Sequence, residues 1–298
     1  MEYKREVRLG RFVESFLLRF PRSCAPSSEL DKPSEKNMSS PELTPILGRT
    51  LVIVAHPDDE TITCGGLLQR MQDPCVVFAT DGAPEDSYFW RRFGSRERYA
   101  EVREQEAHRA LSAVGVHQLE FLSKKSDVPL IDQLLYRALP TAFAALSRIV
   151  ERHRPQCLLT LAYEGGHPDH DSVSFLSAQL GRTFRLPVWE APLYHRNSDG
   201  GGVYQRFVDE DEEIIEYAVT GAELKAKQRM LSCYKSQFDS LPSFNIELER
   251  FRPQASYTYS RRPHMGKVNY ELWQWPMTPE EVSAAFASFS STQAASQT

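Results

Sequence analysis

The sequence predicts an α/β fold: a mostly parallel sheet sandwiched between helices in a Rossmann-like, three-layer arrangement, with an irregular C-terminal cap. Two observations support this prediction. Short, wholly apolar segments such as LVIVA (51–55) and CLLTLA (157–162) alternate with longer segments of helical periodicity. Strands that are apolar on both faces are typical of a parallel sheet covered by helices on both sides. The chain of 298 residues is long enough for one large domain of this kind or for two small ones.

Each element follows from its local pattern. Strands are expected at 51–55, 75–80, 119–122 and 157–162, and helices at 63–71, 96–114, 134–153 and 173–184. Pro140 should kink or split the third helix. After residue 186 the alternation changes, and we expect strands in VWEAPLY and EIIEYAV and a helix in AELKAKQRMLSCYKSQ. We interpret these segments as the far edge of the sheet and a cap over the site.

Composition divides the chain into three parts. Residues 1–48 are expected to be an N-terminal tail, whose stretch 22–48 is rich in Ser, Pro, Glu and Lys and is typical of a disordered linker. Residues 49–287 form the predicted working domain, and the Ser-, Ala- and Gln-rich end, 288–298, is expected to fray. Arginines interrupt the apolar stretch near the N-terminus and no small-residue cleavage site follows, so no secretory signal is expected.

Charge and cysteine usage argue against several classes of function. The chain carries 35 basic and 40 acidic residues, a formal net charge of −5, which gives no reason to expect nucleic acid as a partner. No apolar run approaches the ~20 residues that a transmembrane helix needs. The five cysteines are scattered and odd in number, which is typical of reduced thiols and predicts a cytoplasmic protein. Nothing in the sequence indicates an oligomeric state.

Two of the predicted strands end in side chains that are costly to bury. LVIVA runs into HPDDE (56–60), and CLLTLA is followed, after Tyr-Glu-Gly-Gly, by HPDHD (167–171). Because parallel strands put their carboxyl ends at one edge of the sheet, the two clusters are expected to meet in one site. Imidazole nitrogens plus a carboxylate oxygen, with open positions left, are the ligands of a catalytic zinc. The alternative for either cluster alone is a turn or a helix cap, and for Glu60 a cap or a backbone brace is the preferred interpretation.

These motifs resemble those of the PIG-L/LmbE-type zinc-dependent de-N-acetylases. The resemblance rests on AHPDDE (55–60) with Cys-Gly-Gly at 64–66, and on GHPDH (166–170). It runs from about residue 49 to at least residue 237 and also includes Thr-Asp-Gly at 80–82, Arg103, Glu106, Val-Gly-Val at 114–116 and Lys-Ser-Gln at 235–237. No motif match is claimed for the first 48 residues or beyond residue 240.

The resemblance implies a zinc site and a general base. His56, Asp59 and His170 take the places of the zinc ligands, and Asp58 that of the base that accepts a proton from the attacking water. A zinc ion with three protein ligands lowers the pKa of its bound water to roughly 7 and polarises the amide oxygen. The charge of such an ion would also offset the repulsion between the neighbouring carboxylates.

The resemblance also implies roles around the metal. His167 takes the place of a general acid and oxyanion stabiliser, and Asp169 would orient a histidine and set its tautomer. Arg103 stands where the family holds substrate; without the resemblance it would be interpreted as a solvated helix charge. A tyrosine found near the second motif in some relatives has no counterpart here, because Gly165 occupies its place and Tyr163 lies two residues earlier.

The predicted function is zinc-dependent hydrolysis of an N-acetyl group on an amino-sugar-like small molecule of the N-acetylglucosamine type, with Fe2+ as the alternative ion. Two alternatives stay open: hydrolysis of another N-acyl small molecule or a thiol-conjugate amide, and a non-catalytic relative that only binds. Among the histidines outside the two clusters, which are interpreted as surface or core residues, His195 is the one expected to line the pocket. Trp273 and Trp275 are interpreted either as stacking platforms for a sugar or as ordinary packing residues.

Overall fold

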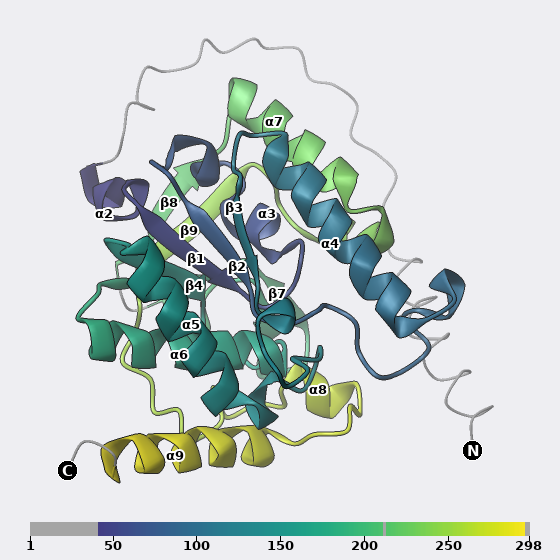
Figure 1. The fold of residues 1–298 in the computed structure, drawn as a ribbon, viewed down its shortest axis with the longest axis vertical. Helices are drawn as coiled ribbons and strands as arrows, with labels where there is room; N and C mark the ends of the chain where they lie inside the picture. Colours follow the sequence, from purple (N-terminus) through teal and green to yellow (C-terminus); the bar gives the residue numbers. More distant parts are fainter. Residues whose placement is uncertain (1–40, 211–212, 296–298) are drawn as a thin grey trace. The chain divides into compact units, whose positions relative to one another are not determined.

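The chain folds around one mostly parallel sheet (Figure 1). A computed structural model describes residues 41–210 and 213–295, and their seven-stranded sheet has the order β3-β2-β1-β4-β5-β9-β8. Five strands pair in parallel: β1 (Thr50–Val54), β2 (Cys75–Phe78), β3 (Gln118–Phe121), β4 (Cys157–Leu161) and β5 (Val188–Ala191). The far edge is antiparallel: β9 (Leu248–Pro253) pairs with β5, and β8 (Ile215–Ala218) with β9. A separate ribbon joins β6 (Tyr194–Arg196) and β7 (Gly202–Tyr204). The predicted fold class is confirmed.

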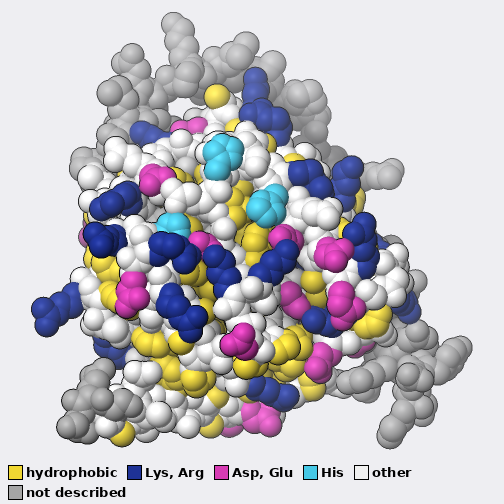
Figure 2. All heavy atoms as spheres, in the orientation of Figure 1, with side chains coloured by type: hydrophobic (Ala, Val, Ile, Leu, Met, Phe, Trp, Pro, Cys, Tyr) yellow, Lys and Arg dark blue, Asp and Glu magenta, His cyan; other side chains and the backbone are white. Residues whose placement is uncertain are grey.

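Helices cover both faces of the sheet. α3 (Asp59–Cys64), α4 (Arg96–Ser112) and α7 (Gly221–Cys233) pack together on one face, and α5 (Leu139–His153), α6 (Pro168–Phe184) and α9 (Pro279–Ala295) on the other (Figure 1). Short helices connect them: η2 (Pro41–Leu43), α2 (Thr44–Leu47), η3 (Leu67–Arg70), η4 (Arg91–Phe93), η5 (Leu122–Lys124), η6 (Leu135–Arg137), η7 (Lys235–Gln237), η8 (Leu241–Ser243) and α8 (Asn269–Leu272). None of the helices in the described part of the chain has the length and apolarity needed to cross a membrane. Basic and acidic side chains are interspersed on the face seen in Figure 2.

The central strands are apolar because both of their faces are covered. Every residue of β1 and of β4 is buried, which explains why their sequences show no alternation of polar and apolar residues. The chain order of the strands reverses between β1 and β4, since β2 follows β1 on one side and β5 follows β4 on the other. Ligands of open parallel sheets bind at such a switch point.

The helix predicted over 63–71 is wrong. α3 begins earlier, at Asp59, ends at Cys64, and is followed by the separate 3-10 turn η3. The carboxylate of Glu249 accepts the backbone N–H groups of Gly66 (2.6 Å) and Leu67 (2.9 Å). The backbone N–H groups that follow α3 thus find their acceptor outside the helix. The chain can therefore turn at this point without leaving these N–H groups unpaired.

Other boundaries differ in smaller ways. Pro140 splits the predicted helix 134–153 into η6 and α5, and it lies in the first turn of α5, where its missing N–H costs nothing. α6 begins at Pro168, so the second motif forms its first turn. Residues 288–295, expected to fray, belong to α9, which buries Phe286 and Phe289. Leu43 and Ile46 of the expected linker are buried in the core. Residues 1–40 and 296–298 lie outside the described residues.

A buried ion pair ties α7 to β9. Lys227 Nζ donates to Glu249 Oε1 at 2.7 Å and to the carbonyl oxygen of Ile62 at 3.1 Å, and both side chains of the pair are fully buried. Because Glu249 also holds the backbone N–H groups at the end of α3, this pair links α7, β9 and the start of the candidate site.

Replacing Lys227 with Met should therefore destabilise the protein by about 3–5 kcal/mol, because Glu249 would remain buried without its counter-charge. The free energy of unfolding in urea measures this. Lys225→Met, on the exposed side of the same helix, is the matched control and should change stability by less than about 0.5 kcal/mol. Equal effects of the two substitutions would contradict the role given to the ion pair.

Candidate active site

The structure brings the two predicted clusters together at the carboxyl ends of β1 and β4. His56 and Asp59 come from the turn after β1 and the first residue of α3, while His167 caps α6 and His170 lies in its first turn. The ring centroid of His56 lies 4.5 Å from that of His167 and 5.2 Å from that of His170. All four residues are buried.

Three side-chain groups converge with the spacing of a metal site. His56 Nδ1 lies 3.3 Å from His170 Nε2 and 3.5 Å from Asp59 Oδ2, and His170 Nε2 lies 3.5 Å from Asp59 Oδ1. Ligand atoms of a tetrahedral site with bonds of about 2.0–2.2 Å are about 3.3–3.5 Å apart. Burial lowers the pKa of His170 to about 4, against the opposing attraction of Asp59, which keeps this imidazole neutral. The donor set therefore fits a divalent cation.

Two carboxylates contact the other ring nitrogen of His56, Nε2. Its Nε2 lies 3.1 Å from Asp169 Oδ2 and 3.2 Å from Asp132 Oδ1. Asp169 also accepts the backbone N–H groups of Gln133 (2.7 Å) and Leu135 (3.0 Å), which occupies both of its oxygens. Asp169 thus orients His56, as a carboxylate behind a metal-ligating histidine does.

His167 is oriented by two different groups. Its Nδ1 accepts the backbone N–H of Asp169 at 3.1 Å, which places the proton of the neutral ring on Nε2. That Nε2 lies 3.3 Å from Asp132 Oδ1, whereas the Asp169 carboxylate is 3.9 Å from Nδ1. The sequence led us to expect a carboxylate such as Asp169 beside His167; the carboxylate that faces its proton is Asp132.

Asp132 was not predicted. It lies in the loop between η5 and η6, beyond the carboxyl end of β3, and belongs to no motif. The available signal was weak: an acidic residue after a third parallel strand, at the sheet edge where the two motifs already end. A group that includes His56, Asp132, His167 and Asp169 also has spacing that could hold a metal. Since Asp169 and His167 Nδ1 are already occupied by backbone N–H groups, the geometry favours the set of His56, Asp59 and His170.

Asp58 is turned away from Asp59 and toward Arg103. The guanidinium of Arg103 donates to Asp58 Oδ1 (3.2 Å) and to the carbonyl oxygens of Pro57 and Gly82 (2.7 Å each). Burial raises the pKa of Asp58 to about 8, although the charge of Arg103 acts in the opposite direction. Arg103 is itself buried, so the geometry favours positioning Asp58 over the predicted contact with substrate.

Two positions left open by the sequence have structural roles. Glu60 is fully buried and accepts the backbone N–H of Asp58 at 3.1 Å and the hydroxyl of Tyr234 at 2.5 Å. Tyr163 donates its hydroxyl to the carbonyl oxygen of Arg261 at 2.7 Å. Gly165 has φ +70°, and a Cβ there would lie 2.4 Å from Val268 Cγ1, so this position is closed to a tyrosine.

Aromatic side chains of the C-terminal half line the histidines. Tyr194, in β6, lies 5.3 Å from His170 between ring centroids, and Trp275 lies 4.9 Å from His167. Trp273 packs against both aromatic residues, at 6.5 Å from Tyr194 and 5.0 Å from Trp275. Burial raises the pKa of Tyr194 far above its ordinary value, and the carboxylates of the site act in the same direction. No sequence motif marked Tyr194, whose ring lies against that of His170.

The remaining histidines lie apart from the two clusters. His195 is buried, and its ring lies 6.1 Å from that of His264. Its Nδ1 faces the carbonyl oxygen of Arg196 at 3.0 Å. We find no contact between His195 and the cluster of His56 and His170 among the interactions of the described residues.

The sequence of this part of the chain matches one protein family. The PIG-L family, described as GlcNAc-PI de-N-acetylase, matches residues 51–180, which include both motifs. These residues are a PIG-L domain. The resemblance inferred from the motifs is thereby confirmed.

Curated relatives of the PIG-L domain are deacetylases. The chain is 31% identical over 179 residues to 1D-myo-inositol 2-acetamido-2-deoxy-alpha-D-glucopyranoside deacetylase of Mycobacterium sp. (strain KMS), which covers 53% of this chain and 57% of the relative. It is 27% identical over 150 residues to the probable N-acetyl-alpha-D-glucosaminyl L-malate deacetylase 2 of Bacillus cereus, covering 49% and 65%. The chain thus spans less than two thirds of the length of these relatives.

Solved structures share the fold. A deacetylase triple mutant from the teicoplanin biosynthetic pathway has a TM-score of 0.55 at 16% identity and covers 69% of this chain and 97% of its own. The A40926 pseudoaglycone deacetylase Dbv21 has a TM-score of 0.52 at 17% identity, covering 70% and 99%. At these identities the likeness supports the α/β architecture of the PIG-L domain.

His170→Ala should bind one metal ion fewer per chain than the wild type, because only two of the three converging groups would remain. Elemental analysis of the purified proteins after dialysis against zinc measures this. His195→Ala is the control, since that histidine is also buried but lies outside the cluster, and it should keep the full metal content. Equal metal in wild type and His170→Ala would refute the ligand set.

Proposed function

We propose that this chain is a metal-dependent N-deacetylase that hydrolyses the acetamide of an N-acetylglucosamine-type small molecule, with zinc as the cation. The observation that carries the proposal is the convergence of His56, Asp59 and His170 at 3.3–3.5 Å beside a separate, differently oriented carboxylate, Asp58. The PIG-L match and the deacetylase relatives support the reaction class. A cytoplasmic location stays a prediction from the scattered cysteines.

A divalent cation bound by these three groups supplies Lewis-acid polarisation of the amide and makes water a stronger acid. The charge of the bound cation would favour the carboxylate form of Asp58, which then accepts the proton of the attacking water. Its carboxylate is held by Arg103, which keeps the accepting oxygen in a fixed place. As the C–N bond breaks, the departing nitrogen takes a proton and the products are acetate and a free amine.

His167 is placed to supply that proton. The hydrogen bond from the backbone of Asp169 fixes its Nδ1, so its Nε2 is the nitrogen that carries and transfers the proton. Asp132 lies 3.3 Å from the same Nε2, so its carboxylate attracts this proton, and the departing nitrogen must approach Nε2 beside Asp132 to take it. Asp132 is thus a positioning residue of the proposed reaction, and Asp169 acts on His56 instead.

The aromatic residues support a cyclic substrate. Tyr194, Trp273 and Trp275 lie against or near the histidine cluster, and the tryptophans are only partly buried. Aromatic faces suit the apolar faces of sugar rings, and the indole or phenol edge offers a polar atom. A different N-acyl small molecule or a thiol-conjugate amide remains the alternative substrate. The alternative class of protein is a non-catalytic relative that only binds its ligand.

Asp58→Asn should lower kcat for acetate release by about 10²–10⁴-fold while metal content is kept, since an amide cannot accept the proton but fills the same space. The assay is acetate release across N-acetylglucosaminides, their lipid and thiol conjugates, and other N-acyl compounds. Asp199→Asn, in an exposed turn, is the matched control and should be as active as the wild type. No acetate from any compound by metal-loaded wild type would overturn the proposed function; activity of Asp58→Asn equal to wild type would overturn the role of Asp58.

Tyr194→Phe should lower kcat by about 10²-fold with little change in metal content, because we propose that the hydroxyl of this ring, 5.3 Å from the ring of His170, donates to the developing oxyanion. Tyr194 would thus supply the donor that cannot stand at Gly165. Tyr204→Phe is the matched control, since Tyr204 pairs with Tyr194 across the ribbon. An unchanged kcat in Tyr194→Phe would assign the tyrosine to packing alone.

A further inference from the structure

A second group of ligand-type side chains lies away from the active site, where β2, β3 and the end of α5 meet. Cys75 is the first residue of β2, Glu120 belongs to β3, and His153 is the last residue of α5. The parallel register pairs Cys75 with Gln118. Because side chains two residues apart share a face of the sheet, Cys75 and Glu120 both point toward α5.

The three ligand atoms converge on a common point. Cys75 Sγ lies 3.8 Å from His153 Nε2, and that nitrogen lies 3.2 Å from Glu120 Oε1. All three atoms lie within 4.8 Å of one another. A tetrahedral ion with a sulfur bond of about 2.3 Å and nitrogen and oxygen bonds of about 2.0–2.2 Å requires separations of about 3.3–3.6 Å. The two distances to His153 Nε2 lie close to this range, and binding of an ion would draw the sulfur and the carboxylate oxygen together around it.

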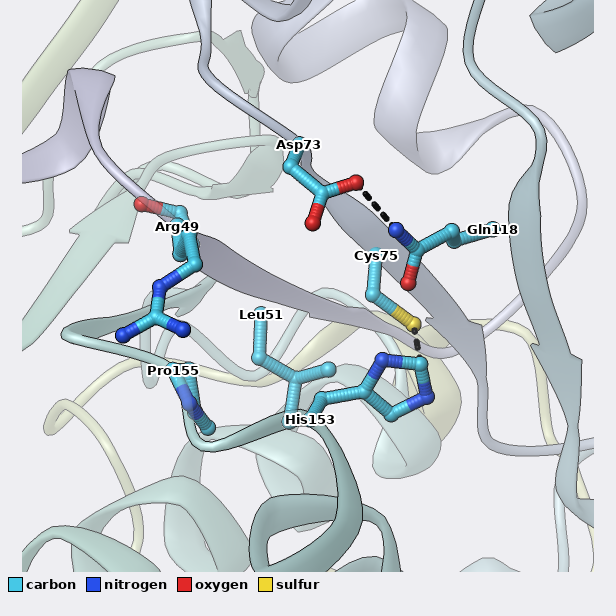
Figure 3. A pocket seen from close by; sticks show the side chains of 8 residues that line it. Arg49, Leu51, Asp73, Cys75, Gln118, His153 and Pro155 are labelled. Carbon is cyan, nitrogen blue, oxygen red and sulfur yellow. Dashed lines mark hydrogen bonds between the residues drawn. The ribbon is translucent and has the colours of Figure 1, made fainter.

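A small opening lies beside the sulfur. Figure 3 shows Cys75 pointing toward the ring of His153, with the hydrogen-bonded side chains of Asp73 and Gln118 nearby. A cavity of about 10 Å³ is lined by these four residues, among others. That is about the volume that a single water molecule needs. The cavity borders two of the three ligand side chains, Cys75 and His153, so a water molecule there could approach an ion from their side.

Two cations compete for the carboxylate. Arg152 Nη2 lies 2.5 Å from Glu120 Oε1, and Lys125 Nζ contacts Oε2. Their side chains are 49% and 45% exposed, so each can move into solvent when an ion binds. The thiolate and the carboxylate balance the charge of a divalent ion, and the negative end of the α5 dipole adds to its attraction. The competition from Arg152 and Lys125 lowers the affinity of the three ligands for a metal ion but does not block the site.

A reactive thiol is the main alternative, and the geometry disfavours it. In a nucleophile–imidazole–carboxylate relay the sulfur and the carboxylate bind opposite ring nitrogens, whereas here both face Nε2 of His153. Burial also raises the pKa of the Cys75 thiol to about 12, and the nearby Glu120 acts in the same direction. The free side chain is thus a poor nucleophile.

We propose that Cys75, Glu120 and His153 form a second metal site, which takes a zinc-class divalent cation and ties β2 and β3 to the end of α5. On binding, the Cys75 S–H bond breaks, its proton leaves to solvent, and the sulfur bonds to the ion. The site lies apart from the groups of the proposed reaction, so it stands or falls independently of the proposed function.

Cobalt(II) tests the proposal directly, because a cobalt–thiolate bond gives a near-ultraviolet charge-transfer band that histidine and carboxylate ligands do not give. The full chain, stripped of metal by a chelator, is titrated with cobalt(II). Wild type and His170→Ala should both show the band, since the proposed active-site ligands include no sulfur. Cys75→Ser and His153→Gln should lose it.

Cys157→Ser is the matched control. Cys157 is also the buried first residue of a strand, β4, but its sulfur contacts only the carbonyl oxygen of Leu158 among the contacts found for it. The band should survive this substitution. A second readout guards against misfolding of the variants: zinc should raise the Tm of His170→Ala but not that of His170→Ala/His153→Gln. No band in the wild type, or a band that persists in Cys75→Ser, would overturn the second site.

Discussion

The geometry of the candidate active site depends on one strained residue. Asp58 has φ +127°, a conformation that non-glycine residues rarely adopt and that costs about 1–3 kcal/mol. The strain lets two consecutive aspartates diverge, with Asp59 facing the two histidines and Asp58 facing Arg103. Glu60 stabilises this turn because its carboxylate accepts the Asp58 backbone N–H. The third acid of the cluster thus keeps the first two apart.

The contacts that hold the turn after β1 extend to residues near the C-terminal end of the PIG-L-like motifs. Tyr234, just after α7, donates its hydroxyl to Glu60 at 2.5 Å. Two residues later, Ser236 donates its backbone N–H and its hydroxyl to Glu106 on α4, at 2.9 and 2.6 Å. Arg103, one turn earlier on α4, reaches the carbonyl oxygen of Pro57. Motif positions far from the reacting groups therefore share one task, which is to hold the turn after β1.

The elements that could be predicted from the sequence are those whose structure follows from the residues of one continuous segment. Buried parallel strands appear as apolar runs, so β1 and β4 and the motifs behind them could be placed. β9 could not, because Glu249 and Arg252 are buried in it as ion pairs with Lys227 and Glu190 and break the apolar pattern. Asp132 also could not, since its partners His56 and His167 come from other elements and its loop carries no pattern. The strain at Asp58 and the role of Glu60 likewise depend on contacts that only the folded chain makes.

Protons and the proposed metal ion would compete for the same buried groups. Burial lowers the pKa of His56, but the carboxylates of Asp132, Asp169 and Asp59 outweigh it and hold the pKa well above the ordinary value. In the metal-free site these carboxylates thus favour a proton on His56. A divalent ion replaces this proton, because a histidine must lose its proton to bind a metal. Metal affinity should therefore rise with pH, and the bound ion should add to the stability of the folded chain. The clustered acids are tolerable because their charge is always shared, either with protons or with an ion.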